Sequence, residues 1–213
     1  MSYLFSHFDR VSQLFIQHLQ ITAGVLALAL LIAMPLGVLI ARVRWLQGPI
    51  LGILGVIYTV PSLSLFVLLI PVFGLGLVPA TIALVAYAQL MLVRNWAVGL
   101  TGIDPALLEA ADGMGMSPWQ RFWQVEFPLA LPLLLAGIRL ATLSTIGIAT
   151  IAAYINAGGL GTLLFEGVVT ANGPKILAGG LAVSVLAIAA NYLLWFLERR
   201  VEIVIRGASE PHT

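Results

Sequence analysis

The chain has 213 residues, of which 61% are hydrophobic and 9% are charged, and its formal net charge is +1. Because soluble domains carry roughly 25% charged residues, this composition excludes an ordinary soluble protein and is typical of a chain surrounded by lipid. The absence of cysteine excludes disulfides and thiolate metal sites. The three histidines are not grouped and there is no basic run, so neither a metal site nor nucleic-acid binding is predicted.

The segment over residues 1–18 is more polar than the stretch over residues 19–41. It contains Asp9 and Arg10 and shows no signal-peptide cleavage pattern, so we expect it to belong to the mature protein. Its apolar residues give it a mildly amphipathic character. We therefore predict an N-terminal interfacial segment that lies on the membrane surface rather than crossing it.

Five apolar stretches come next, and each approaches the roughly 20 residues that a helix needs to cross about 30 Å of hydrocarbon. They run from about Leu19 to Ala41, Ile50 to Ile70, Leu77 to Val93 with an extension to Leu100, Leu131 to Ala153, and Ile176 to Leu197. Pro61 lies inside the second stretch, which we still expect to form one span. The pattern predicts an all-α polytopic membrane protein with about five transmembrane helices in a domain over residues 19–200.

The positive charges lie mostly on one side of these five stretches. Of the 10 Lys and Arg residues, Arg10 and Lys175 fall on one side and the others fall on the opposite side. Since Lys and Arg accumulate in cytoplasmic loops, the N-terminus is predicted outside and the C-terminus inside. Residues 201–213 then form a cytoplasmic C-terminal tail, and the connection between the third and fourth spans is cytoplasmic.

That connection, residues 101–132, is longer than most links between helices. Asp104 followed by Pro105 is typical of a helix start, with an N-cap and a proline in the first turn. Gly113 and Gly115 predict where this first helix ends.

Ser117 followed by Pro118 indicates the start of a second helix in the same way. Apolar residues at helical spacing give this helix one apolar face, and Pro128 and Pro132 are expected to end it. A helix, a glycine turn and a helix on the cytosolic face indicate a docking surface for a soluble partner. The alternative is that both helices simply lie on the lipid interface.

The same connection carries a spaced motif. It reads Glu109-Ala110-Ala111, three residues, Gly115, nine residues, Val125, one residue and Phe127-Pro128. This resembles the EAA loop of ABC importer permeases, whose pattern is EAA, three residues, Gly, nine residues, Ile, one residue and Leu-Pro. The spacing matches throughout, and Val125 and Phe127 keep the apolar character of the family residues.

Further stretches resemble one branch of that family. Val60-Pro61-Ser62-Leu63 is similar to the IPSLAL stretch of the glycine betaine, carnitine and choline permeases, and residues 144–150 are similar to their fourth span. Residues 157–161, AGGLG, resemble their GAGGLG element. Asn156 stands where these permeases usually have glycine, and asparagine tolerates left-handed backbone better than most residues.

The resemblance implies a type I ABC importer permease (MetI-like) architecture in the bacterial inner membrane, carrying a small osmoprotectant such as glycine betaine, choline or carnitine. It implies three kinds of partner: a second permease subunit, identical or homologous, two ATP-binding subunits, and an extracytoplasmic substrate-binding protein. The residues of the ATPase-docking coupling loop would be Glu109, Ala110, Ala111, Gly115, Val125 and Pro128. The sequence has no phosphate-binding glycine loop, so we expect no cofactor and no enzymatic activity on this chain, with ATP bound by the partner subunit.

Quaternary ammonium cations are held by aromatic faces, and polar groups inside a span usually face the bundle interior or a pathway. Tyr58, Ser62 and Tyr87 are therefore candidates for the translocation pathway, with ordinary packing as the alternative. Trp96 lies near a membrane boundary, and we expect it to be an interface-belt or packing residue.

Three other functions remain open. The chain could be an amino-acid ABC permease of the methionine type, an ATPase-independent secondary carrier or channel, or a regulatory membrane scaffold. No acidic residue lies deep in a predicted span, which argues against a proton-coupled carrier. Glu166 and Lys175 fall in the outer loop between the last two spans, where they are either ordinary solvated charges or contacts for the receptor.

Overall fold

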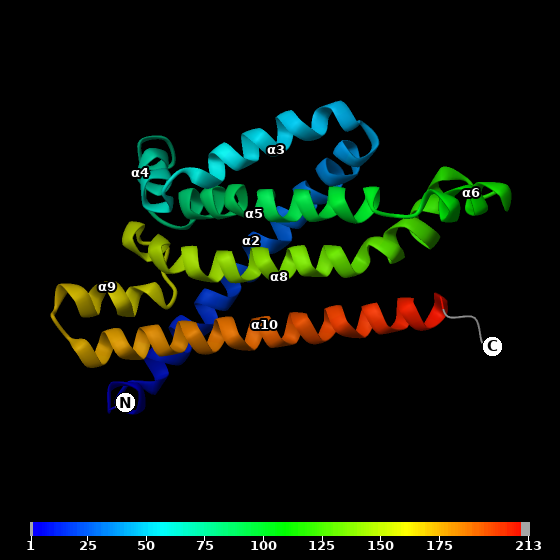
Figure 1. The fold of residues 1–213 in the computed structure, drawn as a ribbon. Helices are drawn as coiled ribbons and strands as arrows, with labels where there is room; N and C mark the ends of the chain where they lie inside the picture. The colour runs from blue at the N-terminus through cyan, green and yellow to red at the C-terminus, as the bar shows by residue number, and fades with distance from the viewer. Residues whose placement is uncertain (1, 210–213) are drawn as a thin grey trace.

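The computed structural model describes residues 2–209, which form a bundle of helices without strands (Figure 1). The long helices are α2 (Phe8–Arg42), α5 (Leu77–Thr101), α8 (Phe127–Ala152) and α10 (Gly173–Ser209). The shorter elements are α1 (Ser2–Ser6), α3 (Arg44–Thr59), α4 (Ser62–Phe73), α6 (Pro105–Gly113), α7 (Pro118–Arg121), the π-turn η1 (Phe122–Glu126), the 3₁₀ turn η2 (Ala153–Ile155) and α9 (Gly161–Val169). The predicted all-α class is confirmed.

The four long helices contain segments that are long and apolar enough to cross a membrane, and the bent pair α3–α4 makes up to five such spans. α5 packs against both α2 and α8 and lies at the centre of the bundle (Figure 1). The two termini lie at opposite ends of the bundle, and α6 lies at the same end as the C-terminus. This arrangement agrees with an odd number of spans.

The N-terminal segment does not form a separate element ending at residue 18. α2 begins at Phe8 and continues unbroken for 35 residues, a length of about 52 Å that exceeds the hydrocarbon thickness. Val11 and His18 are buried, and Val11 packs with Leu163 and Leu186 of α9 and α10. Residue 18 therefore lies inside a helix whose start is packed against other elements, and an interfacial position for residues 1–18 stays a prediction.

The second predicted span is bent rather than straight. α3 and α4 meet at an angle of 94° across Val60 and Pro61. A proline removes one helical hydrogen bond and drives the preceding residue to extended backbone, and Val60 has φ −65° and ψ 130°. The hydroxyl of Tyr87 donates to the Val60 carbonyl at 2.6 Å, so the bend does not leave that carbonyl unpaired.

The outer connection between the last two spans is also more ordered than expected. Its residues form the 3₁₀ turn η2, the helix α9 and the start of α10 instead of a solvated loop. Asn156 has φ 65°, a left-handed backbone conformation that asparagine tolerates better than most residues. Glu166 of α9 pairs with Arg10 of α2 at 2.7 Å and with Lys175 of α10, which joins three helices at this end.

The C-terminal helix passes beyond the predicted end of the transmembrane domain. α10 continues to Ser209, so most of the predicted tail over residues 201–213 is helical, and residues 210–213 lie outside the described part. α2 and α5 approach each other closely at Gly37. A Cβ atom built there would lie 2.3 Å from Cβ of Trp96, which is 5% exposed, so of the two roles expected for Trp96 the structure favours packing over the interface belt.

Candidate functional site

The first helix of the residue 101–132 connection starts where the sequence predicts. The side chain of Asp104 accepts a hydrogen bond from the backbone N–H of Ala106 at 2.9 Å, and Pro105 occupies the first turn of α6. A capped start of this kind satisfies one of the free N–H groups of the helix. α6 ends at Gly113, as expected.

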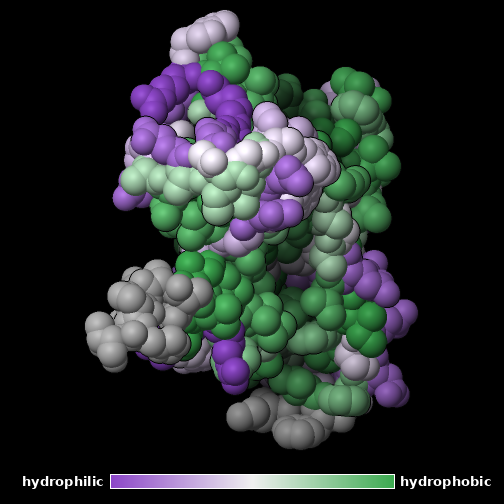
Figure 2. All heavy atoms as spheres, turned by 90° about the vertical axis from the view of Figure 1, so that its right-hand side faces the viewer, coloured by the Kyte–Doolittle hydropathy of each residue, from purple (hydrophilic) through white to green (hydrophobic). Residues whose placement is uncertain are grey.

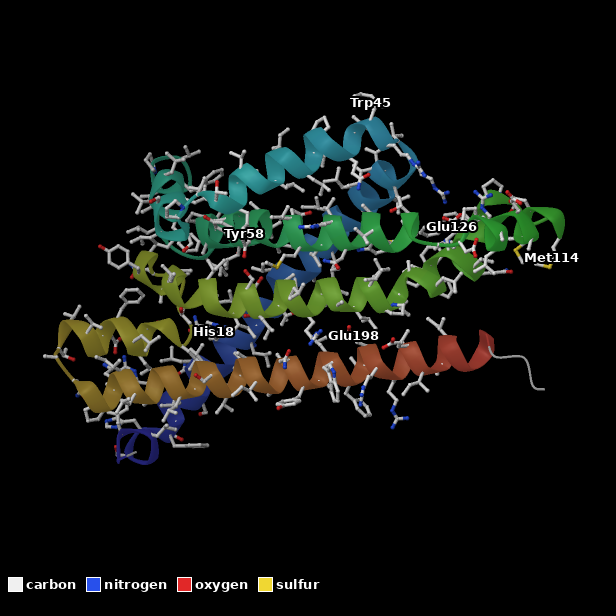
Figure 3. The ribbon with its side chains drawn as sticks, viewed as in Figure 1. His18, Trp45, Tyr58, Met114, Glu126 and Glu198 are labelled. Carbon is white, nitrogen blue, oxygen red and sulfur yellow. The ribbon has the colours of Figure 1, made fainter. Side chains whose placement is uncertain are left out.

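A tight turn comes directly after α6. Gly115 has φ +77°, a left-handed conformation that glycine adopts without steric cost. The N–H groups of Gly115 and Met116 donate to the carbonyls of Asp112 and Ala111, which closes the turn. Met114 lies at the tip of this turn and is 69% exposed. The turn is at the far end of the molecule from the N-terminus (Figure 3).

The second helix also starts as predicted but does not end as predicted. Ser117 and Gln120 form a reciprocal capping box, with bonds of 2.9 Å and 3.3 Å. Pro128 and Pro132 do not end the helix, because η1 leads from α7 directly into α8. Pro128 lies in the first turn of α8, directly after the π-turn, and Pro132 is accommodated inside α8.

The predicted docking residues divide into two groups. Glu109, Ala110 and Gly115 are exposed on α6 and its turn, where a partner can reach them. The other members of the predicted set, Ala111, Val125 and Pro128, are buried or half-buried at the base of the connection. Ala111 is 1% exposed and packs within the chain, so the accessible surface of α6 is formed by its neighbours, and the docking role of the whole set stays a prediction.

Hydrophilic side chains gather on the end of the molecule that carries α6, whereas much of the surface around them is hydrophobic (Figure 2). Trp119 and Trp123 lie beside this hydrophilic surface with their rings 5.6 Å apart. They line an apolar groove of about 600 Å³ together with residues of α2. Exposed tryptophan between a polar end and an apolar flank is typical of the membrane–water interface, which indicates that α6 faces the aqueous side.

Charged residues that the sequence reasoning missed lie at the base of α6. Glu126, with a side chain 3% exposed, accepts hydrogen bonds from Arg42 and, at 3.0 Å, from Arg121. Arg121 also donates to both carboxylate oxygens of Asp112, at 2.8 and 2.6 Å. The sequence does place charges of both signs, Asp112, Arg121 and Glu126, within one short connection, and this pattern could have predicted ion pairs between them. The pairing with Arg42 could not be predicted, because Arg42 lies 84 positions before Glu126.

The candidate pathway residues gather at the α3–α4 bend. The rings of Tyr58 and Tyr87 meet edge to face with centroids 5.9 Å apart, and Ser62 begins α4. Tyr87 is 4% exposed and its hydroxyl is occupied by the Val60 carbonyl, which favours the packing interpretation for this residue. A pathway role for Tyr58 and Ser62 stays a prediction.

The apolar spans and the capped hydrophilic element at one end define a multi-pass membrane protein with a structured connection outside its spans. The sequence model of the family described as "Binding-protein-dependent transport system inner membrane component" matches residues 33–203. The chain belongs to this family.

Proteins with sequences similar to this chain are named as permeases of transport systems. The osmoprotectant import permease protein OsmW of Salmonella typhimurium is 41% identical over 208 residues, covering 95% of both chains. The glycine betaine/carnitine/choline transport system permease protein OpuCB of Bacillus subtilis is 39% identical over 185 residues, covering 87% of this chain and 85% of the relative. A chain from the inward-facing MetNI methionine ABC transporter matches with a TM-score of 0.81 at 22% identity, over 94% of this chain and 99% of that chain, which confirms the expected fold.

Proposed function

We propose that this chain is the permease subunit of an ATP-driven importer for a small osmoprotectant of the quaternary amine class. The observation that carries the proposal is the 41% identity to an osmoprotectant import permease over 95% of both chains. Other similar permeases are named for choline and for carnitine, at 40% identity each. The methionine transporter has the same fold at 22% identity, so the osmoprotectant assignment is favoured over a methionine permease.

ATP is bound by a separate subunit in this proposal. The chain has no glycine loop followed by Lys-Ser/Thr that could hold phosphates. α6 is the element that docks on the ATPase, since it is exposed, capped at its start and held by a glycine turn. Glu109 and Ala110 form its accessible face, and Glu109 supplies a charge for a basic residue of the partner.

The assembly contains two permease subunits, two ATPases and an extracytoplasmic binding protein, with α6 in the cytoplasm. ATP binding brings the two ATPases together, and each ATPase moves the α6 that rests on it. Because a capped helix transmits displacement better than a flexible loop, the movement reaches the spans and opens the pathway outward. ATP hydrolysis then returns the assembly to its inward-open state.

Co-purification and uptake test this proposal. Purified from its host membrane, the chain should bring down an ATPase in stoichiometric amount, and the complex in liposomes should take up glycine betaine, choline or carnitine only when ATP is supplied. Glu109→Arg should weaken ATPase binding, whereas Asp9→Arg, an equal charge change at an exposed site in the other half of the bundle, should not. A Glu109→Arg complex that binds its ATPase and transports normally would contradict the docking role, and ATP-independent uptake would favour a secondary carrier.

A further inference from the structure

Glu126 is a buried carboxylate at the junction between the α6–α7 connection and the membrane helices. It ends η1, immediately before α8, and its side chain is 3% exposed (Figure 3). A buried charge persists in a protein only when it is paired and hydrogen-bonded. Both of its oxygens are engaged, Oε2 by Nη2 of Arg42 and Oε1 by Nε of Arg121.

Arg121 joins this carboxylate to α6. Its Nε donates to Glu126, while its Nη1 donates to both oxygens of Asp112 on α6. Only a guanidinium presents two separate donor edges in a fixed geometry, and a lysine ammonium at the same place cannot bridge two carboxylates in this way. The four residues Asp112, Arg121, Glu126 and Arg42, called here the salt-bridge network, therefore link α6 to the last residue of α2 and the start of α8.

Apolar packing holds α6 only weakly. Of the residues of α6, all of which the structure describes, only Ala111 is buried, and alanine buries little area. The orientation of α6 relative to the spans therefore depends on the directional bonds of the salt-bridge network. The π-turn aims Glu126 into the protein, and turns of this kind occur frequently at functional sites.

We propose that Arg121 and Glu126 are positioning residues that fix α6 relative to α2 and α8, so that displacement of α6 moves the spans instead of bending the connection. This inference rests on the proposed docking of an ATPase on α6. Arg42 passes the displacement to α2, and the covalent link from Glu126 to Phe127 passes it to α8.

The chain contains no cysteine, so introduced cysteines can be spin-labelled without background. Labels at Met114→Cys and Trp45→Cys, which are 69% and 74% exposed, report the distance between the α6 turn and the start of α3, close to Arg42. Labelled chains are mixed into an excess of unlabelled chains so that pairs between subunits are rare. We expect a narrow distance distribution in the parent chain and a clearly broader one in Arg121→Lys.

The same variants are then measured for transport in the intact complex. We expect Arg121→Lys to keep its bound ATPase but to hydrolyse several-fold more ATP per substrate molecule carried. Asp112→Asn, altered at a carboxylate whose side chain is 54% exposed, should act in the same direction. Arg44→Lys is the matched control, because Arg44 lines the same small pocket as Glu126 and makes no ion pair with the residues described.

The proposal would be overturned if neither Arg121→Lys nor Asp112→Asn changed the distance distribution. It would also be overturned if the distribution broadened while the number of ATP molecules hydrolysed per substrate molecule carried stayed normal. Failure of the parent chain to bind any ATPase is a different result. It would reject the proposed function and the transmission step with it, while the distance measurement would still decide whether the network fixes α6.

Discussion

Replacing Gly37 by alanine tests how tightly α2 and α5 are packed. The added Cβ would lie 2.3 Å from Cβ of Trp96 and 3.0 Å from its Cγ. Because Cβ is attached directly to the backbone, a rotamer change of Trp96 cannot relieve this contact, and the two helices must separate. Small residues allow such close approach between membrane helices, so the crossing loses its packing when one is enlarged.

The expected cost can be worked out from this geometry. Overpacking a well-packed core typically costs about 1–3 kcal/mol. Gly24 lies on the same helix, and a Cβ there meets nothing within 4 Å. Gly24→Ala should therefore be neutral or slightly stabilising, because alanine favours the helix by about 0.5–1 kcal/mol over glycine.

Thermal unfolding of the purified chain in detergent, monitored by a fluorescence reporter of aggregation, compares the two variants. We expect Gly37→Ala to unfold at a lower temperature than the parent and Gly24→Ala at the same temperature or a higher one. Equal unfolding temperatures for the two variants would refute the packing argument, because both variants replace a glycine of α2 by alanine and differ only in what surrounds the added methyl group.

Three further substitutions test individual polar contacts. Tyr87→Phe removes the hydrogen bond to the carbonyl at the α3–α4 bend and should cost about 1 kcal/mol in unfolding, whereas Tyr58→Phe should cost little because its hydroxyl makes no hydrogen bond within the described residues. Ser117→Ala removes the capping box of α7 and should cost about 1 kcal/mol, seen as faster proteolysis between α6 and α7. His18→Ala leaves a buried backbone N–H unpaired and should lower the unfolding temperature, while His7→Ala, at an exposed site, should not.

Local signals in the sequence predicted local structure well. Asp104 and Pro105 predicted the start of α6, Ser117 predicted the start of α7, and Gly115 predicted the turn between them. These predictions succeed because caps and glycine turns depend on a few adjacent residues. Hydropathy likewise gave most of the spans, since the bilayer sets the length and polarity of a crossing helix.

The missed features depend on residues distant in sequence. The bend at Pro61 has its freed carbonyl paired by Tyr87 of another helix, and the burial of Glu126 depends on Arg42, 84 positions earlier. The extension of α2 toward the N-terminus requires the apolar surface of α9 and α10. A proline, a carboxylate or an amphipathic segment has no single structural outcome until its tertiary partner is known.

α2 makes polar contacts near both ends of the bundle. Near its start, Gln17 accepts from the N–H of Gly159 at 2.9 Å, and His18 accepts from the N–H of Leu160 through Nδ1 at 3.3 Å. With Nδ1 accepting, Nε2 carries the proton and donates to a carbonyl of α8. At its other end, Arg42 holds Glu126 beneath α6. A continuous helix fixed to the turn before α9 and to the base of α6 cannot shift at one end without moving the other. In the proposed importer, α2 is therefore the element best placed to carry a displacement of α6 to the opposite end of the bundle.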